Sequence, residues 1–151
     1  MSKITTDTTR IFEIPSDTNS VPVARGVKIY EGTLVGRTPE GYGRSLEKGD
    51  VAVGFAKDHV DNTGGEDGDK TVELKAQGKI VLQMNGITIA DVGRNVYATD
   101  DNTFTFSMKL NSFVGKLIRI EKPDHGVVAF DFFANVPSGL IITEPLDPII
   151  P

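Results

Sequence analysis

The residues best suited to chemistry lie in one acidic, glycine-rich stretch, residues 58–70, which reads DHVDNTGGEDGDK. Carboxylate oxygens are the ligands that calcium prefers in proteins. The candidates are Asp58, Asp61, Glu66, Asp67 and Asp69. Their spacing does not match an EF-hand, and a glycine-rich loop holds carboxylates loosely. We therefore expect a mobile, solvated surface loop, with a single cation bridging subunits as the alternative.

Other residue types that support catalysis or cofactor binding are dispersed along the chain. His59 and His125 stand in predicted loops, far apart in sequence, and neither belongs to a metal or triad spacing. Gly41-Tyr42-Gly43 begins like a dinucleotide fingerprint, but Leu46 replaces the third glycine and no helix is predicted after it. We interpret the histidines as surface residues and the glycine pair as a turn.

An enzyme is the weakest of the function classes that we consider. A metal-dependent hydrolase would need Asp100 and Asp101, or the acidic loop, to supply its ligands. Paired carboxylates could also support glycoside hydrolysis, because their separation is a three-dimensional quantity. However, glycan clefts are usually lined by aromatic side chains, and the chain has no Trp and only 3 Tyr. We expect no enzymatic activity, no cofactor and no resident metal.

Composition narrows the range of partners. There is no cysteine, so disulfides, thiol nucleophiles and zinc–thiolate sites are excluded. The net charge is −5 and the 16 basic residues are scattered, which argues against nucleic acid as a partner. No long apolar run predicts a membrane span. The first ten residues, MSKITTDTTR, lack the apolar stretch of a secretory signal, so we expect synthesis in a cytoplasm.

The elements that position these residues are short strands separated by turns. Residues 27–37 and 42–46 should form a hairpin, because residues 38–41 read Thr-Pro-Glu-Gly, a type I turn pattern. Asn85-Gly86 is a two-residue hairpin signal. Further strands are predicted at residues 51–56, 72–75, 80–82, 113–121 and 126–132, and a single helical turn within residues 87–94.

The most regular alternation lies in residues 103–110. Phe104, Phe106, Met108 and Leu110 would face one side of a strand and the polar residues between them the other. This pattern predicts a strand with one face in the core.

These patterns predict an all-β fold, a small barrel or sandwich of short strands. We divide the chain into an extended N-terminal arm at residues 1–25, a β domain at residues 26–132 and an apolar, proline-rich C-terminal tail at residues 133–151. Proline disfavours a helix or a central strand in that tail.

Both ends carry aliphatic and aromatic side chains that an ordinary solvated tail would lack. We predict that these residues contact a neighbouring subunit, a partner protein or the chain's own domain. The predicted contact residues are Ile11, Phe12, Ile14, Leu140, Ile141, Ile142, Leu146, Ile149 and Ile150. A tail folded back would cap a sheet edge, whereas a donated tail would join subunits.

The order of several motifs resembles that of the small capsid cement, or decoration, proteins of tailed bacteriophages. A glycine-aspartate turn enters a strand at residues 49–56, a glycine-marked strand follows at residues 72–82, and a closing strand lies at residues 113–120. Between them, residues 90–105 read ADVGRNVYATDDNTFT, with the spacing Asp-x-Gly-x-x-Val-Tyr. The resemblance covers roughly residues 26–132 and transfers no catalytic residue.

The resemblance implies a β domain that binds the outer surface of an assembled icosahedral capsid, often as a homotrimer near threefold positions. Its partners would be the major capsid protein and copies of itself, and its location the virion. The alternative is a virion receptor- or glycan-binding module, such as the base of a fibre. That alternative predicts exposed aromatic side chains.

Overall fold

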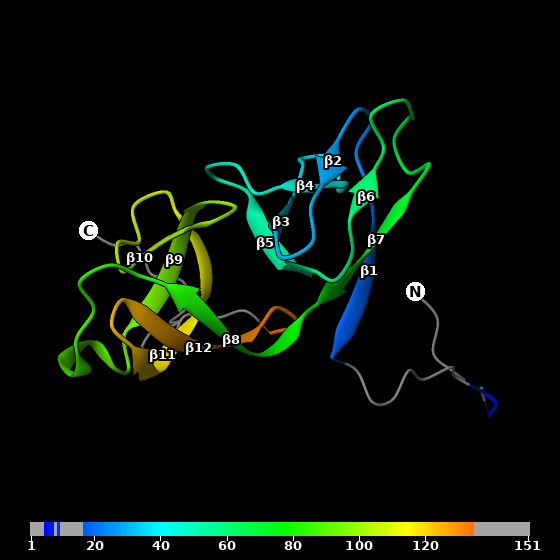
Figure 1. Cartoon of the computed structure of the whole chain (residues 1–151). Coiled ribbons are helices and arrows are strands. Elements are labelled where there is room, and N and C mark those ends of the chain that lie inside the picture. The colour runs from blue at the N-terminus through cyan, green and yellow to red at the C-terminus, as the bar shows by residue number, and fades with distance from the viewer. Residues whose placement is uncertain (1–4, 8, 10–16, 135–151) are drawn as a thin grey trace, which may run out of the picture.

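The computed structural model describes residues 5–7, 9 and 17–134, and within them the protein is all-β, with three antiparallel sheets (Figure 1). The first sheet has the order β1(Thr18–Pro22), β7(Thr71–Lys75), β5(Val51–Ala56), β3(Leu34–Arg37), β4(Gly43–Ser45). The second has the order β10(Thr103–Thr105), β9(Asn95–Asp100), β11(Ser112–Lys122), β12(His125–Asp131), β8(Gln77–Gln83). The third pairs β2(Lys28–Ile29) with β6(Val60–Asp61). The predicted all-β class is thus confirmed.

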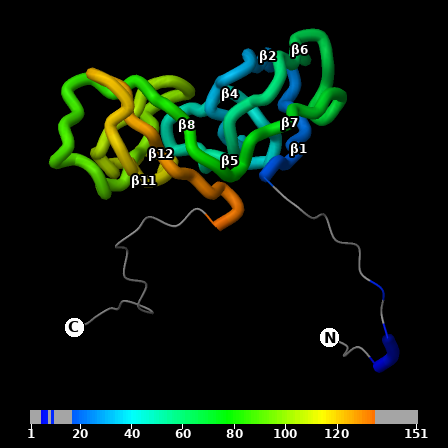
Figure 2. The backbone as a smooth tube through the Cα atoms, turned by 60° about the horizontal axis from the view of Figure 1, so that its bottom comes forward, coloured from blue at the N-terminus to red at the C-terminus, as the bar shows by residue number. Residues whose placement is uncertain are grey.

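One nearly continuous stretch of chain joins the two large sheets. Strands β7 and β8 are separated only by Ala76 and run from the first sheet into the second, as both views show (Figures 1 and 2). Ala76 is buried, its N–H donates to the carbonyl of Asp17, and its carbonyl accepts from the N–H of Phe132. The two large sheets therefore share one stretch of backbone. At Ala76, where this stretch passes between them, the N–H and the carbonyl are both hydrogen-bonded.

The main core lies where the two sheets meet. Leu34, Ala52 and Phe55 come from the first sheet and pack with Leu117 and Val128 of the second. A second cluster packs within the first sheet and beneath β2, and consists of Val21, Val23, Ile29, Val35, Val53, Ala56, Val72 and Leu74. Because the first cluster draws on both sheets, neither sheet can lose its partner without exposing apolar area.

Part of the predicted N-terminal arm belongs to the domain. Residues 18–22 form β1 and pair antiparallel with β7, and Val21 and Val23 lie in the second cluster. Pro22 is tolerated because β1 is an edge strand of its sheet. The β domain thus begins near residue 17, and not at residue 26.

The predicted core strand at residues 103–110 is wrong beyond residue 105. Strand β10 ends at Thr105 and has a bulge between Thr103 and Phe104. Phe104 and Phe106 are partly buried against the main core, but Met108 and Leu110 are exposed. The alternation continues in the sequence after the strand has turned away from the sheet.

The remaining turns follow the sequence more closely. Strands β3 and β4 form the predicted hairpin, closed by a hydrogen bond from the N–H of Gly41 to the carbonyl of Thr38. Strands β11 and β12 form another. Asn85-Gly86 makes a turn but no hairpin, because it leads from β8 to η1(Ile89–Asp91), a single 3-10 turn within the predicted helical segment. No helix in the described part of the chain is long and apolar enough to cross a membrane.

Candidate interaction surface

The loop at residues 106–111 presents two large apolar side chains to solvent. Met108 is 63% exposed and Leu110 is 79% exposed. Leu110 has a φ of +53°, in the left-handed region that costs a branched residue about 1 kcal/mol. An exposed leucine held in this conformation has no stabilising role of its own in the described fold.

Hydrogen bonds within the loop hold it in this shape. The N–H of Ser107 donates to Oγ1 of Thr105 at 3.1 Å, and the N–H of Asn111 donates to the carbonyl of Met108 at 2.8 Å. Nδ2 of Asn111 donates to the carbonyl of Ser107 at 3.0 Å. The loop is therefore a hydrogen-bonded turn that displays Met108 and Leu110.

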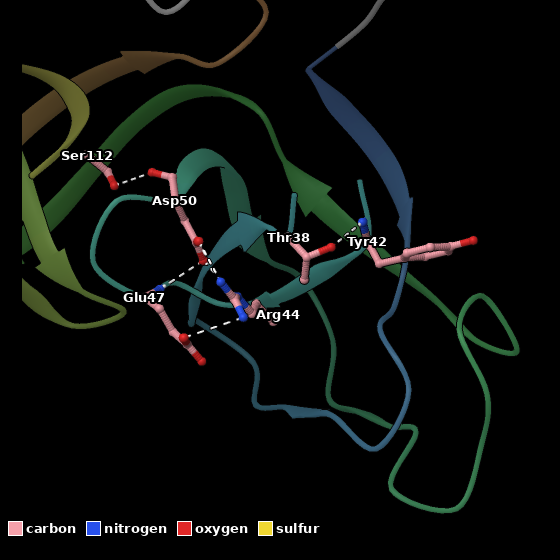
Figure 3. A network of polar contacts seen from close by, with 6 residues as sticks. All are labelled: Thr38, Tyr42, Arg44, Glu47, Asp50 and Ser112. Atoms are coloured by element: carbon pink, nitrogen blue, oxygen red, sulfur yellow. Dashed lines mark hydrogen bonds and ion pairs between the residues drawn. The ribbon is translucent and has the colours of Figure 1, made fainter. Parts of the chain in front are cut away.

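Two contacts fasten the C-terminal end of the loop to the first sheet. Nζ of Lys48 donates to Oδ1 of Asn111 at 3.1 Å. Oγ of Ser112 donates to the carbonyl of Asp50, and both residues are buried (Figure 3). The loop's position thus depends on the turn that precedes β5.

Asp50 organises that turn (Figure 3). Arg44 binds its carboxylate with two donors, Nε at 3.0 Å and an Nη at 2.8 Å, and the N–H of Glu47 adds a third hydrogen bond at 3.0 Å. Burial by itself would raise the pKa of Asp50, but the bonds from Arg44 and Glu47 outweigh it and lower that pKa. The pKa of Arg44 is raised by the same hydrogen bond. The pair is charged and fully engaged at neutral pH.

The segment that follows the 3-10 turn η1 lies beside this loop. The guanidinium of Arg94 lies 4.2 Å from the centre of the Phe106 ring, and Arg94 also pairs with Asp91 of η1 at 3.1 Å. Gly93, Arg94, Phe106 and Met108 line a common hollow of about 330 Å³. We call the exposed side chains Met108 and Leu110 the apolar surface.

The pKa of Asp91 fits its structural role next to that surface. Its Oδ2 accepts the N–H of Thr88 at 2.9 Å, and this bond, followed by the one from Arg94, lowers the pKa of the carboxyl. Asp91 therefore serves as a capping carboxylate. Chemically, the apolar surface offers no acid, base or nucleophile, and suits non-covalent contact with an apolar partner surface.

The acidic loop is organised by a buried amide. Asn62 is only 2% exposed, and its Nδ2 donates to the carbonyls of Val23, Ala24 and Glu66. The carboxylates of this loop also accept backbone N–H groups: Asp61 from Thr63, Asp67 from Arg25, and Asp69 from Glu66. Its composition predicts a mobile loop, whereas the structure shows a hydrogen-bonded one.

The other candidate residues do not form a site together. His59 packs edge-on against Tyr30, whereas Nδ1 of His125 lies 2.9 Å from the carbonyl of Pro123 in the β11–β12 turn. Gly41-Tyr42-Gly43 is the predicted turn, entering β4. The carboxylate of Asp100 accepts the N–H of Asn102, which lowers its pKa, and the carbonyl of Asp101 accepts from Leu34.

Among the described residues, no group of three or more His, Asp or Glu side chains is arranged to hold a metal ion. The predicted contact residues Ile11, Phe12, Ile14, Leu140, Ile141, Ile142, Leu146, Ile149 and Ile150 all lie outside the described residues. That prediction therefore stays a prediction.

Sequence reasoning assigned Met108 and Leu110 to the core and so missed the apolar surface. One signal was available: Asn111 and Ser112 follow Leu110 directly, and polar residues of these types favour turns over a continued strand. The contact of Arg94 with Phe106 is long-range in sequence and had no comparable signal.

The chain was also compared with known proteins. No protein-family model, no curated protein and no solved structure matches it.

Proposed function

We propose that this protein is a non-enzymatic capsid decoration protein, which binds the outer surface of an assembled phage head and strengthens contacts between major capsid proteins. The observation that carries the proposal is the apolar surface, with Met108 and Leu110 held out by a hydrogen-bonded loop. Large apolar side chains held exposed in this way are typical of a protein–protein contact.

The order of motifs in residues 49–120 adds support of a different kind, because it points to the capsid as the partner. In this proposal the copies associate as a homotrimer on the virion, with Ile11, Phe12 and Ile14 of the predicted N-terminal arm contributing. A protein that binds only the assembled lattice stabilises it by mass action. Many copies engaging at once strengthen modest single contacts through avidity.

The energetics of the apolar surface suit such modest contacts. Burying one exposed leucine or methionine side chain contributes about 1.5–3 kcal/mol. Met108 and Leu110 together can therefore supply a useful share of binding at each site without any charged contact. Binding through this surface should depend only weakly on salt.

Sedimentation with expanded cognate capsids that lack the protein tests the proposal. We expect saturable binding that requires the assembled lattice, and a Met108→Ser/Leu110→Gly variant that binds roughly tenfold or more weakly, since it removes two buried apolar groups. A matched control is Val51→Thr, which alters another exposed apolar residue on β5. Absence of lattice-dependent binding, or equal loss in both variants, contradicts the proposal.

The second candidate, a glycan- or receptor-binding module, is favoured by one exposed aromatic side chain. Tyr30 is exposed, with the His59 ring 5.2 Å away and Nζ of Lys28 5.9 Å from its centre. An aromatic ring beside polar groups can stack on a sugar. Whole-cell or glycan binding that is lost in Tyr30→Ala, with no capsid binding, would favour this function.

A further inference from the structure

A long groove follows the free edge of β8. Its largest part has a volume of about 600 Å³ and is lined by Phe55, Ile80 and Phe130, with Gly78 between them. A Cβ at Gly78 would lie 3.6 Å from the Phe130 ring, so the glycine keeps this part of the groove open. The groove therefore has an apolar floor at one end.

Two further hollows share lining residues with this groove or with each other, and the third reaches the far end of β8. Glu31 and Gly32 line both the first hollow and a second one of about 350 Å³. Asn102 lines the second and a third of about 360 Å³, which reaches Gln83 at the end of β8. We call the three together the β8 groove. In the described structure β8 is the last strand of its sheet, so its outer edge offers unpaired backbone groups.

The described chain ends beside this groove. The Phe132 ring packs on two groove residues, 6.0 Å from the Phe55 ring and 5.4 Å from the Phe130 ring, and the last described residue is Ala134. Six further residues reach Leu140, a span of at most about 20 Å. The aliphatic residues that follow are therefore tethered within reach of the groove.

The sequence of the tail matches β8 in length and offers acidic residues to Lys79 of the groove. Residues 138–144, SGLIITE, form a proline-free run of 7 residues, the same length as β8. Residues 135–151 contain Glu144 and Asp147 and no lysine or arginine. The groove is lined by Lys57, Lys75 and Lys79 and also by Asp17 and Glu31; Lys57 and Lys75 are ion-paired, and among the described residues Lys79 makes no ion pair.

We infer that residues 140–142 of the same chain occupy the β8 groove, pairing with the free edge of β8 and placing aliphatic side chains over Phe55, Ile80 and Phe130. A tether this short gives an effective concentration in the mM range, which exceeds the ~10 µM of a second copy in solution. The chain's own tail is thus the favoured occupant. This inference does not depend on the proposed function.

Because the chain has no cysteine, a disulfide trap tests this directly in the full-length protein. In Lys79→Cys/Ile141→Cys we expect an intramolecular disulfide, forming about a hundredfold faster than a bond between chains at ~10 µM. The control is Lys70→Cys/Ile141→Cys, whose exposed first position lies at the opposite end of the β7–β8 stretch. Mainly interchain bonds, or equal rates in both pairs, would overturn the inference.

Hydrogen exchange gives a second readout that needs no new cysteine. Amides of β8 that face the free edge should exchange at least tenfold faster in an Ile141→Asp/Ile142→Asp variant than in the parent chain. Amides of β9, which lies between two strands of the same sheet, should be unchanged. Equal β8 exchange in both proteins would contradict occupation of the groove by these residues.

Discussion

The loop at residues 58–70 and the loop at residues 106–111 are both shaped by hydrogen bonds, but the first buries a polar side chain whereas the second exposes apolar ones. The acidic loop buries a polar side chain, Asn62, and uses it to satisfy three backbone carbonyls. The loop at residues 106–111 exposes apolar side chains and satisfies its backbone through Asn111 and Thr105. In both loops, the hydrogen bonds of the backbone decide the shape, and the hydropathy of the side chains does not. The first loop is therefore structural, whereas the second is free to serve a partner.

The largest expected effect is on the acidic loop. Asn62→Ala removes the donor to the carbonyls of Val23 and Ala24, near the start of the domain, and of Glu66 in the loop itself, and we expect a loss of about 3 kcal/mol in the free energy of unfolding. Urea denaturation measures it. Asp58→Ala, an exposed position in the same loop, should change stability by less than about 0.5 kcal/mol. Equal effects would mean that Asn62 does not organise the loop.

A smaller loss is expected at the residue that positions the other loop. Asp50→Asn weakens the pairing with Arg44, a contact that is partly open to solvent, and should cost about 2 kcal/mol. It should also loosen residues 106–111, which are fastened through the Asp50 carbonyl and Lys48. Amide exchange of Ser107 and Asn111 would report this loosening. A variant as stable as the parent would show that the pairing of Asp50 with Arg44 does not stabilise the fold.

The same carboxylate predicts how stability depends on pH. The folded-state pKa of Asp50 lies below its unfolded value of about 4, so its contribution is fully present above pH 4 and is lost as the pH falls through the folded pKa. Asp17, Asp61, Asp91 and Asp100 have lowered pKa values as well and add to the loss. Urea unfolding at pH 5 and pH 2.5 should show a smaller difference for Asp50→Asn than for the parent. An unchanged difference would contradict this assignment.

The smallest expected change in stability is at the tip of the second loop. Leu110→Gly relieves the left-handed backbone conformation and removes a side chain that is 79% exposed, so stability should stay constant or rise by about 0.5 kcal/mol. Thermal unfolding checks this. Removing a core leucine would instead lower the free energy of unfolding by about 3 kcal/mol or more, and a loss of that size would show that Leu110 belongs to the core.

Local signals in the sequence were sufficient for the elements that they specify directly. The Thr-Pro-Glu-Gly turn at residues 38–41 predicts the β3–β4 hairpin, and the strands predicted at residues 113–121 and 126–132 form the β11–β12 hairpin. The pairing of β1 with β7 joins residues 49 to 57 positions apart, and no local pattern specifies such a partner. The predicted arm at residues 1–25 therefore included residues that belong to the β domain.

The candidate site was harder to predict, because periodicity marks a face without saying whether anything covers it. The alternation at residues 103–110 correctly predicts that Phe104 and Phe106 pack on the core. It failed at Met108 and Leu110, where the bulge in β10 and the turn at residues 107–111 redirect the chain. Likewise, the polar composition of the acidic loop gives no sign that Asn62 is buried.

A cryo-EM map of expanded capsids carrying the protein tests the central claim most directly. We predict that the β domain sits on the outer surface of the shell, with Met108 and Leu110 against the major capsid protein. A map that shows no bound protein, or one in which these two side chains face solvent while another face meets the shell, would contradict the account.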